Sequence, residues 1–188
     1  MKTSIALLLS LFACVSFAED DSLFQLMNYY EYSDKLMSAG QPLPEQFPSI
    51  AAAGIETVIN LAPLDSPTAV ADEAKIVEGL GMRYVFIPVD WEAPPVADVE
   101  RFLAAMQANE GRRILVHCMA NARASAFTYL YRVLRAGHDR TEAAATMVRI
   151  WDMNPGYELK IVPQWQTLIE DASATLATSG QDASSQPQ

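Results

Sequence analysis

Cysteine and histidine are scarce in this chain. Its 188 residues include two of each: Cys14, Cys118, His117 and His138. No spacing typical of metal ligands relates them, so we expect no metal site. Basic residues are also few, because 13 Lys and Arg stand against 23 Asp and Glu, and a net charge of −10 offers no basic face to a nucleic acid. The chain also lacks the G-x-x-x-x-G-K loop that cradles nucleotide phosphates, and we expect no cofactor.

The first 18 residues have the features of a secretory signal peptide. Lys2 provides the positive start, and an apolar stretch follows from Ile5 to Val15. Small residues at Ser16 and Ala18 then precede the acidic Glu19. The apolar stretch is too short to span a membrane. We therefore predict cleavage after Ala18 and a periplasmic protein without a membrane span; a buried helix in a cytosolic protein is the alternative.

The cysteine in this segment permits another interpretation. Residues 11–14 loosely resemble the lipidation box of bacterial lipoproteins, although Phe12 is bulky for that motif. Lipid attachment at Cys14 is therefore the alternative to simple cleavage. If Cys14 leaves with the signal, Cys118 is the only thiol and no internal disulfide forms. A lone cysteine in an exported domain suggests a reactive thiol.

The rest of the sequence predicts one α/β domain. Apolar residues make up 51% of the chain and charged residues 19%, as in globular proteins. Buried strands are expected at residues 57–61, 84–89 and 114–116, with amphipathic helices between and after them. This alternation is typical of a mostly parallel central sheet with helices on both faces. We place the domain at residues 19–172 and a disordered tail, rich in Ser, Ala, Gln and Thr, at 173–188.

Three chemically capable side chains follow predicted strands. They are Asp65, Asp90 and Cys118. The carboxyl ends of parallel strands meet at one edge of a sheet, and ligands bind there. We therefore expect these three side chains to share a site.

The segment after the third strand carries the clearest chemical signal. Cys118 directly follows the strand, and a short loop of residues 119–122 leads to Arg123 and a helix. Successive loop amides can form an anion nest, and the helix start adds positive potential. Arg123 can bind two oxygens of an oxyanion, and the same field favours the thiolate form of Cys118. The segment can thus hold a tetrahedral anion above a sulfur nucleophile, as covalent phosphoryl transfer requires.

These residues also resemble a known family. His117, Cys118, the short loop, Arg123 and a nearby serine resemble the signature loop of the protein-tyrosine and dual-specificity phosphatase superfamily. Upstream, residues 38–44 and 54–61 are similar to a bacterial, atypical dual-specificity-like branch, with its Gly-Gln-Pro and Val-Ile-Asn-Leu segments. Residues 87–91 resemble the general-acid region of that branch. The resemblance covers residues 38–134 and implies the three-layer architecture of a cysteine phosphatase.

The resemblance also implies a role for each residue. Cys118 is expected to form a phosphocysteine, Arg123 to hold the phosphate and Asp90 to protonate the leaving group. Glu92 and then Asp65 are the alternatives for the proton donor. The residues expected to contact the substrate are Met119, Ala120, Asn121, Ala122 and Ser125, with His117 supporting the cysteine. The expected partner is a phosphorylated protein or small molecule, and neither its identity nor the oligomeric state follows from the sequence.

One feature departs from the superfamily pattern. Four residues separate Cys118 from Arg123, where the usual loop has five. The shorter spacing also resembles rhodanese sulfurtransferases, which carry a persulfide on the cysteine. The post-arginine hydroxyl falls at Ser125 when counted from Cys118, and at Ala124 when counted from Arg123. A sulfurtransferase, or a phospho-ligand binder without catalysis, therefore remains an alternative to the phosphatase.

Overall fold

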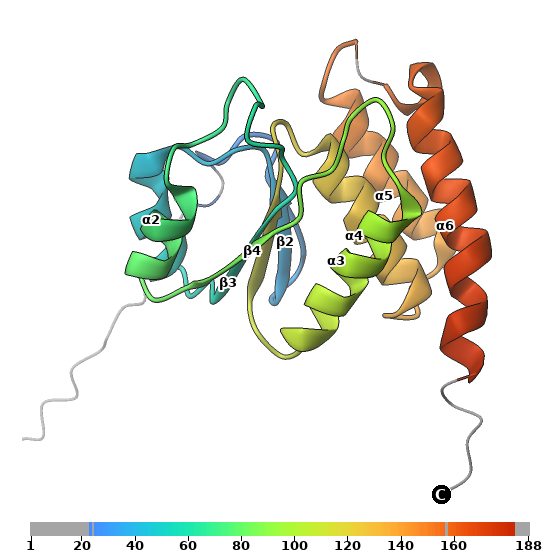
Figure 1. Ribbon diagram of the computed structural model, residues 1–188, viewed down its shortest axis with the longest axis horizontal. Helices are drawn as coiled ribbons and strands as arrows, with labels where there is room; N and C mark the ends of the chain where they lie inside the picture. Colours follow the sequence, from blue (N-terminus) through green and yellow to red (C-terminus); the bar gives the residue numbers. More distant parts are fainter. Residues whose placement is uncertain (1–22, 24, 157, 183–188) are drawn as a thin grey trace, which may run out of the picture.

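A computed structural model of the protein describes residues 23, 25–156 and 158–182 (Figure 1). The predicted signal peptide, the lipidation motif at Cys14 and the last six residues lie outside this range. None of the helices among the described residues is long and apolar enough to cross a membrane.

The described part of the chain builds a five-stranded sheet in the order β1-β2-β5-β3-β4. Its strands are β1 (Tyr30–Ser33), β2 (Leu36–Ala39), β3 (Thr57–Asn60), β4 (Arg83–Phe86) and β5 (Ile114–His117). All neighbours are parallel except β1, which runs antiparallel to β2. Ala39 and Asn60 both lie level with His117, so β2, β3 and β5 end at the same height. The loops that follow these strands therefore meet at one edge.

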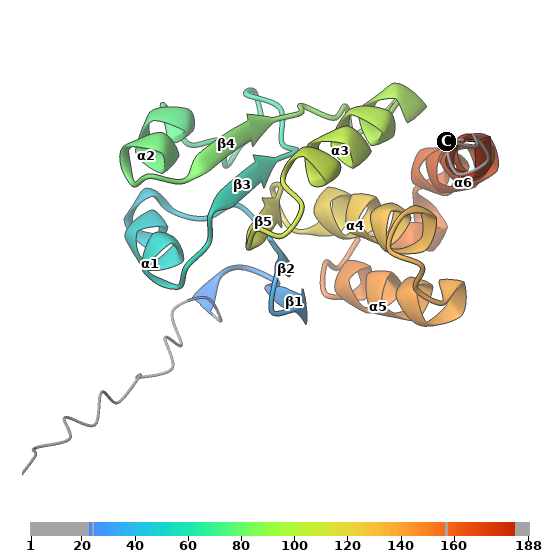
Figure 2. The same cartoon turned by 90° about the horizontal axis from the view of Figure 1, so that it is seen from below.

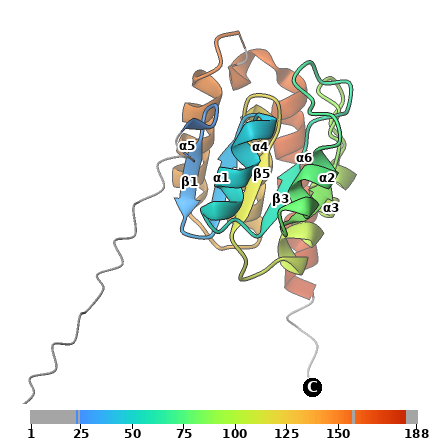
Figure 3. The same ribbon diagram turned by 90° about the vertical axis from the view of Figure 1, so that its left-hand side faces the viewer.

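Helices cover both faces of the sheet, as predicted. On one face lie α1 (Phe47–Ala52) and α2 (Glu73–Gly79); on the other lie α3 (Val96–Ala108), α4 (Ala122–Leu134), α5 (Arg140–Asp152) and α6 (Pro163–Asp182) (Figures 2 and 3). Side chains alternate along a strand, so Leu115 joins the core under α1 and α2 while Ile114 and Val116 join the larger core under α3 to α6. Both faces of β5 are buried, which explains the three consecutive apolar residues Ile114, Leu115 and Val116.

The structure differs from the sequence prediction in three places. The pair β1–β2 was not predicted, because two four-residue strands interrupted by polar side chains give little periodic signal. The strand predicted at residues 84–89 is shorter: β4 ends at Phe86, and Pro88 two residues later has no amide to donate to a neighbouring strand. The predicted domain end at residue 172 lies inside α6, which continues to Asp182 with Ala172 and Leu176 buried one turn apart.

Candidate active site

Cys118 lies at the carboxyl edge of the sheet, one residue beyond β5 and four residues before the start of α4. Asn121 makes the turn into the helix with a φ of 70°, a conformation that asparagine tolerates better than most residues. Gly40 follows β2 and runs against this loop; a Cβ there would lie 3.0 Å from the carbonyl oxygen of Met119. The Gly-Gln-Pro segment therefore begins with glycine because its backbone and the backbone of the cysteine loop approach closely.

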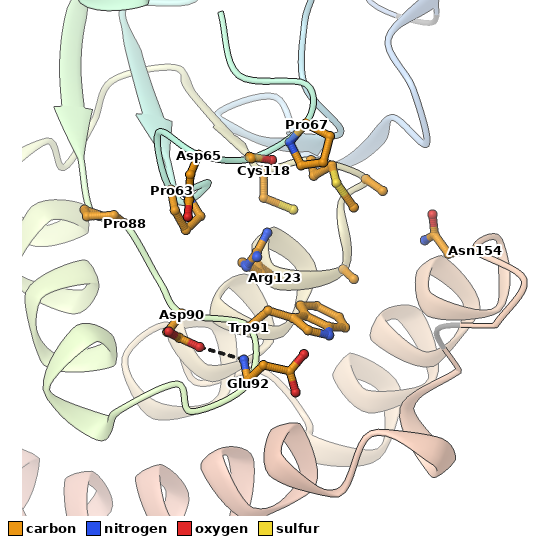
Figure 4. A pocket seen from close by; sticks show the side chains of 14 residues that line it. Pro63, Asp65, Pro67, Pro88, Asp90, Trp91, Glu92, Cys118, Arg123 and Asn154 are labelled. Atoms are coloured by element: carbon orange, nitrogen blue, oxygen red, sulfur yellow. Dashed lines mark hydrogen bonds between the residues drawn. The ribbon is translucent and has the colours of Figure 1, made fainter.

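A pocket of about 700 Å³ opens above this loop (Figure 4). Asp65, Asp90 and Cys118 all line it, so the prediction that they share an edge is confirmed. The other lining residues are Pro63, Ser66, Pro67, Pro88, Trp91, Glu92, Met119, Ala120, Ala122, Arg123 and Asn154. Among the described residues, no three His, Cys, Asp or Glu side chains are grouped so that they could hold a metal ion. The pocket therefore presents a thiol, a guanidinium and three carboxyl groups.

Arg123 is the only basic side chain that lines this pocket, and it is 8% exposed. Its Cζ lies 5.2 Å from the centre of the Trp91 ring. Within the described part of the chain, its Nε has no hydrogen-bond partner and its guanidinium no ion-pair partner. A buried charge without an ion-pair partner is costly, so this guanidinium is a candidate group for binding an anion.

The first turn of α4 is left open to an anion as well. The side chain of Asn121 does not cap the helix; its Nδ2 donates instead to the carbonyl oxygen of Asn28 at 2.6 Å. The first amides of a helix have no acceptor within the helix. Those of α4 lie beside Cys118 and Arg123, where an anion would accept their hydrogen bonds.

Asn28 holds the cysteine loop in place through a hydrogen bond to Ala120. Its Nδ2 donates to the carbonyl oxygen of Ala120 at 3.1 Å and to Oδ1 of Asn154 at 2.9 Å. Asn154 follows α5 and is buried against the pocket. Sequence reasoning missed both asparagines, because only the folded chain brings residues 28, 121 and 154 together.

A third residue that the sequence did not reveal, Glu73, contacts the histidine next to Cys118. Its Oε1 lies 2.9 Å from Nε2 of His117, and the two side chains are 4% and 0% exposed. The carboxylate also accepts hydrogen bonds from Gln41 at 2.6 Å and Asn60 at 3.1 Å. The Gly-Gln-Pro and Val-Ile-Asn-Leu segments thus each contribute one amide to the group that holds His117 beside Cys118.

Burial of Glu73 by itself would raise its pKa. The hydrogen bond and charge of His117, with hydrogen bonds from Gln41 and Tyr84, outweigh that effect and hold the pKa below its ordinary value. The carboxylate is therefore ionised in the folded protein at neutral pH.

We expect the free energy of unfolding of Glu73→Gln to decrease less in acid than that of the native protein. Because the pKa of Glu73 is lower in the folded than in the unfolded chain, its contribution is complete above the unfolded pKa of about 4.3. It is lost as the pH falls through the folded pKa. Between about pH 5 and pH 3, the free energy of unfolding should thus fall more steeply in the native protein than in the variant. Denaturant titrations at several pH values measure both slopes.

The substitution leaves a way to keep the local hydrogen bonds. Among the described residues, Oε1 of Gln41 has no hydrogen-bond partner, so this amide can rotate and accept a bond from the new glutamine. Glu78→Gln, on the exposed side of the same helix, is the matched control and should keep the native slope. Parallel slopes for the native protein and Glu73→Gln would contradict the assignment.

Not all predicted substrate contacts reach the pocket. Met119, Ala120 and Ala122 line it, but Ser125 does not. Ser125 is 1% exposed, and its hydroxyl donates to the carbonyl oxygen of Ala122 at 3.0 Å. The four-residue loop starts α4 early, so Ser125 already lies past the open first turn and bonds back along the helix. Asn121 shapes the loop through its backbone and its bond to Asn28.

Asp90 lies across the pocket from Cys118, on the loop between β4 and α3 (Figure 4). It is fully exposed, and its Oδ1 accepts hydrogen bonds from the amides of Ala93 at 3.0 Å and Glu92 at 2.7 Å. These two amides, and to a smaller extent the charge of Arg123, lower the pKa of Asp90. Without a substrate the carboxylate is therefore ionised at neutral pH.

Trp91 anchors this loop to the helices. Its ring lies 5.7 Å from the ring of Trp151 on α5 and 5.1 Å from that of Trp165 on α6, measured between centroids. The indole of Trp165 also donates to the carbonyl oxygen of Trp91 at 3.0 Å. The ring of Trp91 also lies under the guanidinium of Arg123.

Comparison with known proteins identifies a phosphatase family. The family described as DSP-PTPase phosphatase fused to NAD+ kinase matches residues 8–170. The chain is also similar to a beta-lactamase hydrolase-like protein of Xylella fastidiosa (strain Temecula1), with 30% identity over 122 residues. This match covers 63% of the chain and 28% of that protein, so the chain spans less than a third of such relatives.

Solved structures share the fold. A Shewanella putrefaciens CN-32 protein, described as a candidate phosphatase of family DUF442, is 39% identical with a TM-score of 0.72; the match covers 83% of this chain and 97% of that one. TpbA of P. aeruginosa in complex with phosphotyrosine is 18% identical with a TM-score of 0.62, covering 81% and 90%, and shows the fold alone. The chain thus belongs to the DSP-PTPase phosphatase family, within the protein-tyrosine and dual-specificity superfamily of cysteine-dependent phosphatases.

Proposed function

We propose that this chain is an exported phosphomonoester hydrolase that works through a phosphocysteine on Cys118. One observation carries the proposal: Arg123 is buried in the same pocket as the thiol and has no ion-pair partner among the described residues. The uncapped start of α4 adds amide donors beside it. A tetrahedral dianion bound there has its central atom within reach of a sulfur nucleophile.

The reaction has two steps. The Cys118 thiolate attacks phosphorus, and an Sγ–P bond forms as the bond to the leaving oxygen breaks. Arg123 and the loop amides hold the three equatorial oxygens, and Asp90 donates a proton to the leaving oxygen. Water then attacks phosphorus and gives a proton to the Asp90 carboxylate as the Sγ–P bond breaks, so inorganic phosphate leaves and the thiolate and the protonated Asp90 are both restored.

The volume of the pocket and one structural neighbour support a choice of substrate class to test. A volume of about 700 Å³ exceeds what a phosphate group alone needs, which leaves room for the group that carries it. TpbA was solved with phosphotyrosine bound. An aryl phosphate, such as phosphotyrosine in a peptide, is therefore the first substrate to test.

The four-residue loop supports a rival function, sulfur transfer through a Cys118 persulfide. A paired assay separates the two. Purified protein should release phosphate from an aryl phosphate and form no thiocyanate from thiosulfate and cyanide. Thiocyanate formation without phosphate release would replace the phosphatase with a sulfurtransferase. Inactivity in both assays would favour the third alternative, a phospho-ligand binder without catalysis.

Export is the part of the proposal that rests on residues 1–18 alone. The intact mass of protein from the periplasm should correspond to a chain that begins at Glu19. A cytosolic protein that retains Met1 would contradict export. A diacylglycerol adduct on Cys14 would instead support the lipoprotein alternative.

A further inference from the structure

A second hollow lies at the other end of the β5–α4 unit. Its volume is about 180 Å³, and residues from the start of β5 and the end of α4 line it, including Ile114 and Arg132. Cys118 and Arg123 lie at the end of β5 and the start of α4. The two hollows are therefore separated by the length of the strand and helix that connect them, and the phosphatase mechanism makes no use of the second.

Arg132 reproduces here the arrangement of Arg123. It is 7% exposed, and its Cζ lies 5.2 Å from the centre of the Tyr32 ring. Its Nε and Nη1 are buried without hydrogen-bond partners among the described residues, and no carboxylate of those residues lies within ion-pair distance. A ring face supports the cation, but it satisfies neither N–H group.

The rim of the hollow is also basic. Lys35 and His138 line it, with Glu110 as the single acidic lining residue. Arg112 lines it too but is paired with Glu56 at 3.3 Å. An excess of positive charge at one spot is notable in a chain with a net charge of −10.

The C-terminus of α4 repels an anion less than most helix C-termini do, because some of its carbonyl groups already accept hydrogen bonds. A helix C-terminus carries partial negative charge on its free carbonyl groups. Here the carbonyl oxygen of Arg132 accepts a bond from the amide of His138 at 2.9 Å, and that of Tyr131 accepts bonds from Arg135 and Ala136. Guanidinium groups bind tetrahedral oxyanions through paired N–H donors. We propose that this hollow is a second binding site, for a small tetrahedral oxyanion such as inorganic phosphate.

Inorganic phosphate is the probe that tests the site. In ¹⁵N-labelled Arg123→Gln protein, where the catalytic pocket is weakened, phosphate should cause saturable NMR shifts at the amides of Gly111 and His138. Chloride at equal ionic strength should not. In Arg123→Gln/Arg132→Gln the shifts should disappear, and Arg132→Lys should weaken binding several-fold because it removes the paired donors. Shifts that persist in the double variant, or that are confined to residues 118–124, would overturn the proposal.

Enzyme activity and a second variant test whether the Arg132 variants are folded. Arg132→Gln alone should keep the native rate of aryl-phosphate hydrolysis within about twofold, since the residue lies away from the reacting atoms. If that variant does not fold, Lys35→Gln/His138→Gln on the exposed rim serves instead and should weaken the phosphate-dependent shifts in the Arg123→Gln background. Unchanged affinity in that protein would count against the site.

Discussion

Replacement of Cys118 by serine is expected to reduce hydrolysis of an aryl phosphate by a factor on the order of 10⁴ or more. A serine hydroxyl stays protonated at neutral pH and is a much weaker nucleophile than a thiolate. The side chain is 1% exposed at the base of the pocket, and serine is of similar size, so the fold should persist. Release of inorganic phosphate from p-nitrophenyl phosphate, measured as kcat/KM, tests the expectation.

Ligand binding provides the control for this variant. Arg123 and the amides of α4 remain, so Cys118→Ser should still bind inorganic phosphate. Vanadate, which mimics the phosphoryl transition state, should inhibit the native protein. Native activity in Cys118→Ser would exclude covalent catalysis by the cysteine, whereas loss of both activity and phosphate binding would indicate a damaged site.

Asp90→Asn is expected to slow hydrolysis of phenyl phosphate by about 10²–10⁴-fold, the usual contribution of a general acid. A phenoxide is a poor leaving group and needs a proton, whereas a nitrophenoxide needs one much less. The nitrophenyl ester should therefore lose less activity. Asparagine keeps an Oδ1 that can accept the bonds from Glu92 and Ala93, so the loop should retain its shape.

The pH dependence gives a second test of Asp90. Two backbone amides and the charge of Arg123 lower the pKa of this carboxyl. A general acid acts in its protonated form, so kcat/KM for phenyl phosphate should fall as the pH rises above that pKa. Bound phosphate adds negative charge and opposes ionisation, so kcat should fall at a higher pH than kcat/KM. Both declines should vanish in Asp90→Asn.

Two further variants decide between the carboxyl groups of the pocket. Glu92→Gln and Asp65→Asn should each leave the ratio of the two rates, on phenyl and nitrophenyl phosphate, close to native. If one of them shows the loss that depends on the leaving group and Asp90→Asn does not, that residue is the proton donor. If none does, no side chain supplies the proton and the binding alternative gains support.

The layers of the fold and the cysteine loop could be predicted because their signals are local. β3 and β5 contain short stretches of buried β-branched and other apolar residues, and the order of cysteine, small residues, arginine and helix is contiguous. Two strands near the start escaped prediction because β2 is stabilised by pairing with β5, about 78 residues later, and not by its own pattern.

The supporting residues of the site could not be predicted for a related reason. Glu73 lies on a short helix and has the sequence appearance of a surface acid. Its function appears only where it meets His117, 44 residues along the chain. Asn28 and Trp91 likewise acquire their contacts from segments that are distant in sequence. Long-range contacts of this kind leave no periodicity within a single sequence.

The tryptophan cluster next to Arg123 provides an intrinsic fluorescence signal for ligand binding. The chain has three tryptophans, and the ring centroids of Trp91, Trp151 and Trp165 all lie within 5.8 Å of one another. Nearly all ultraviolet emission excited at the indole band thus originates from this cluster, in which the Trp91 ring lies directly below the guanidinium. When an anion draws on that cation, the indole face loses part of its electrostatic partner. Rapid-mixing fluorescence can therefore follow ligand entry and departure in the unlabelled protein.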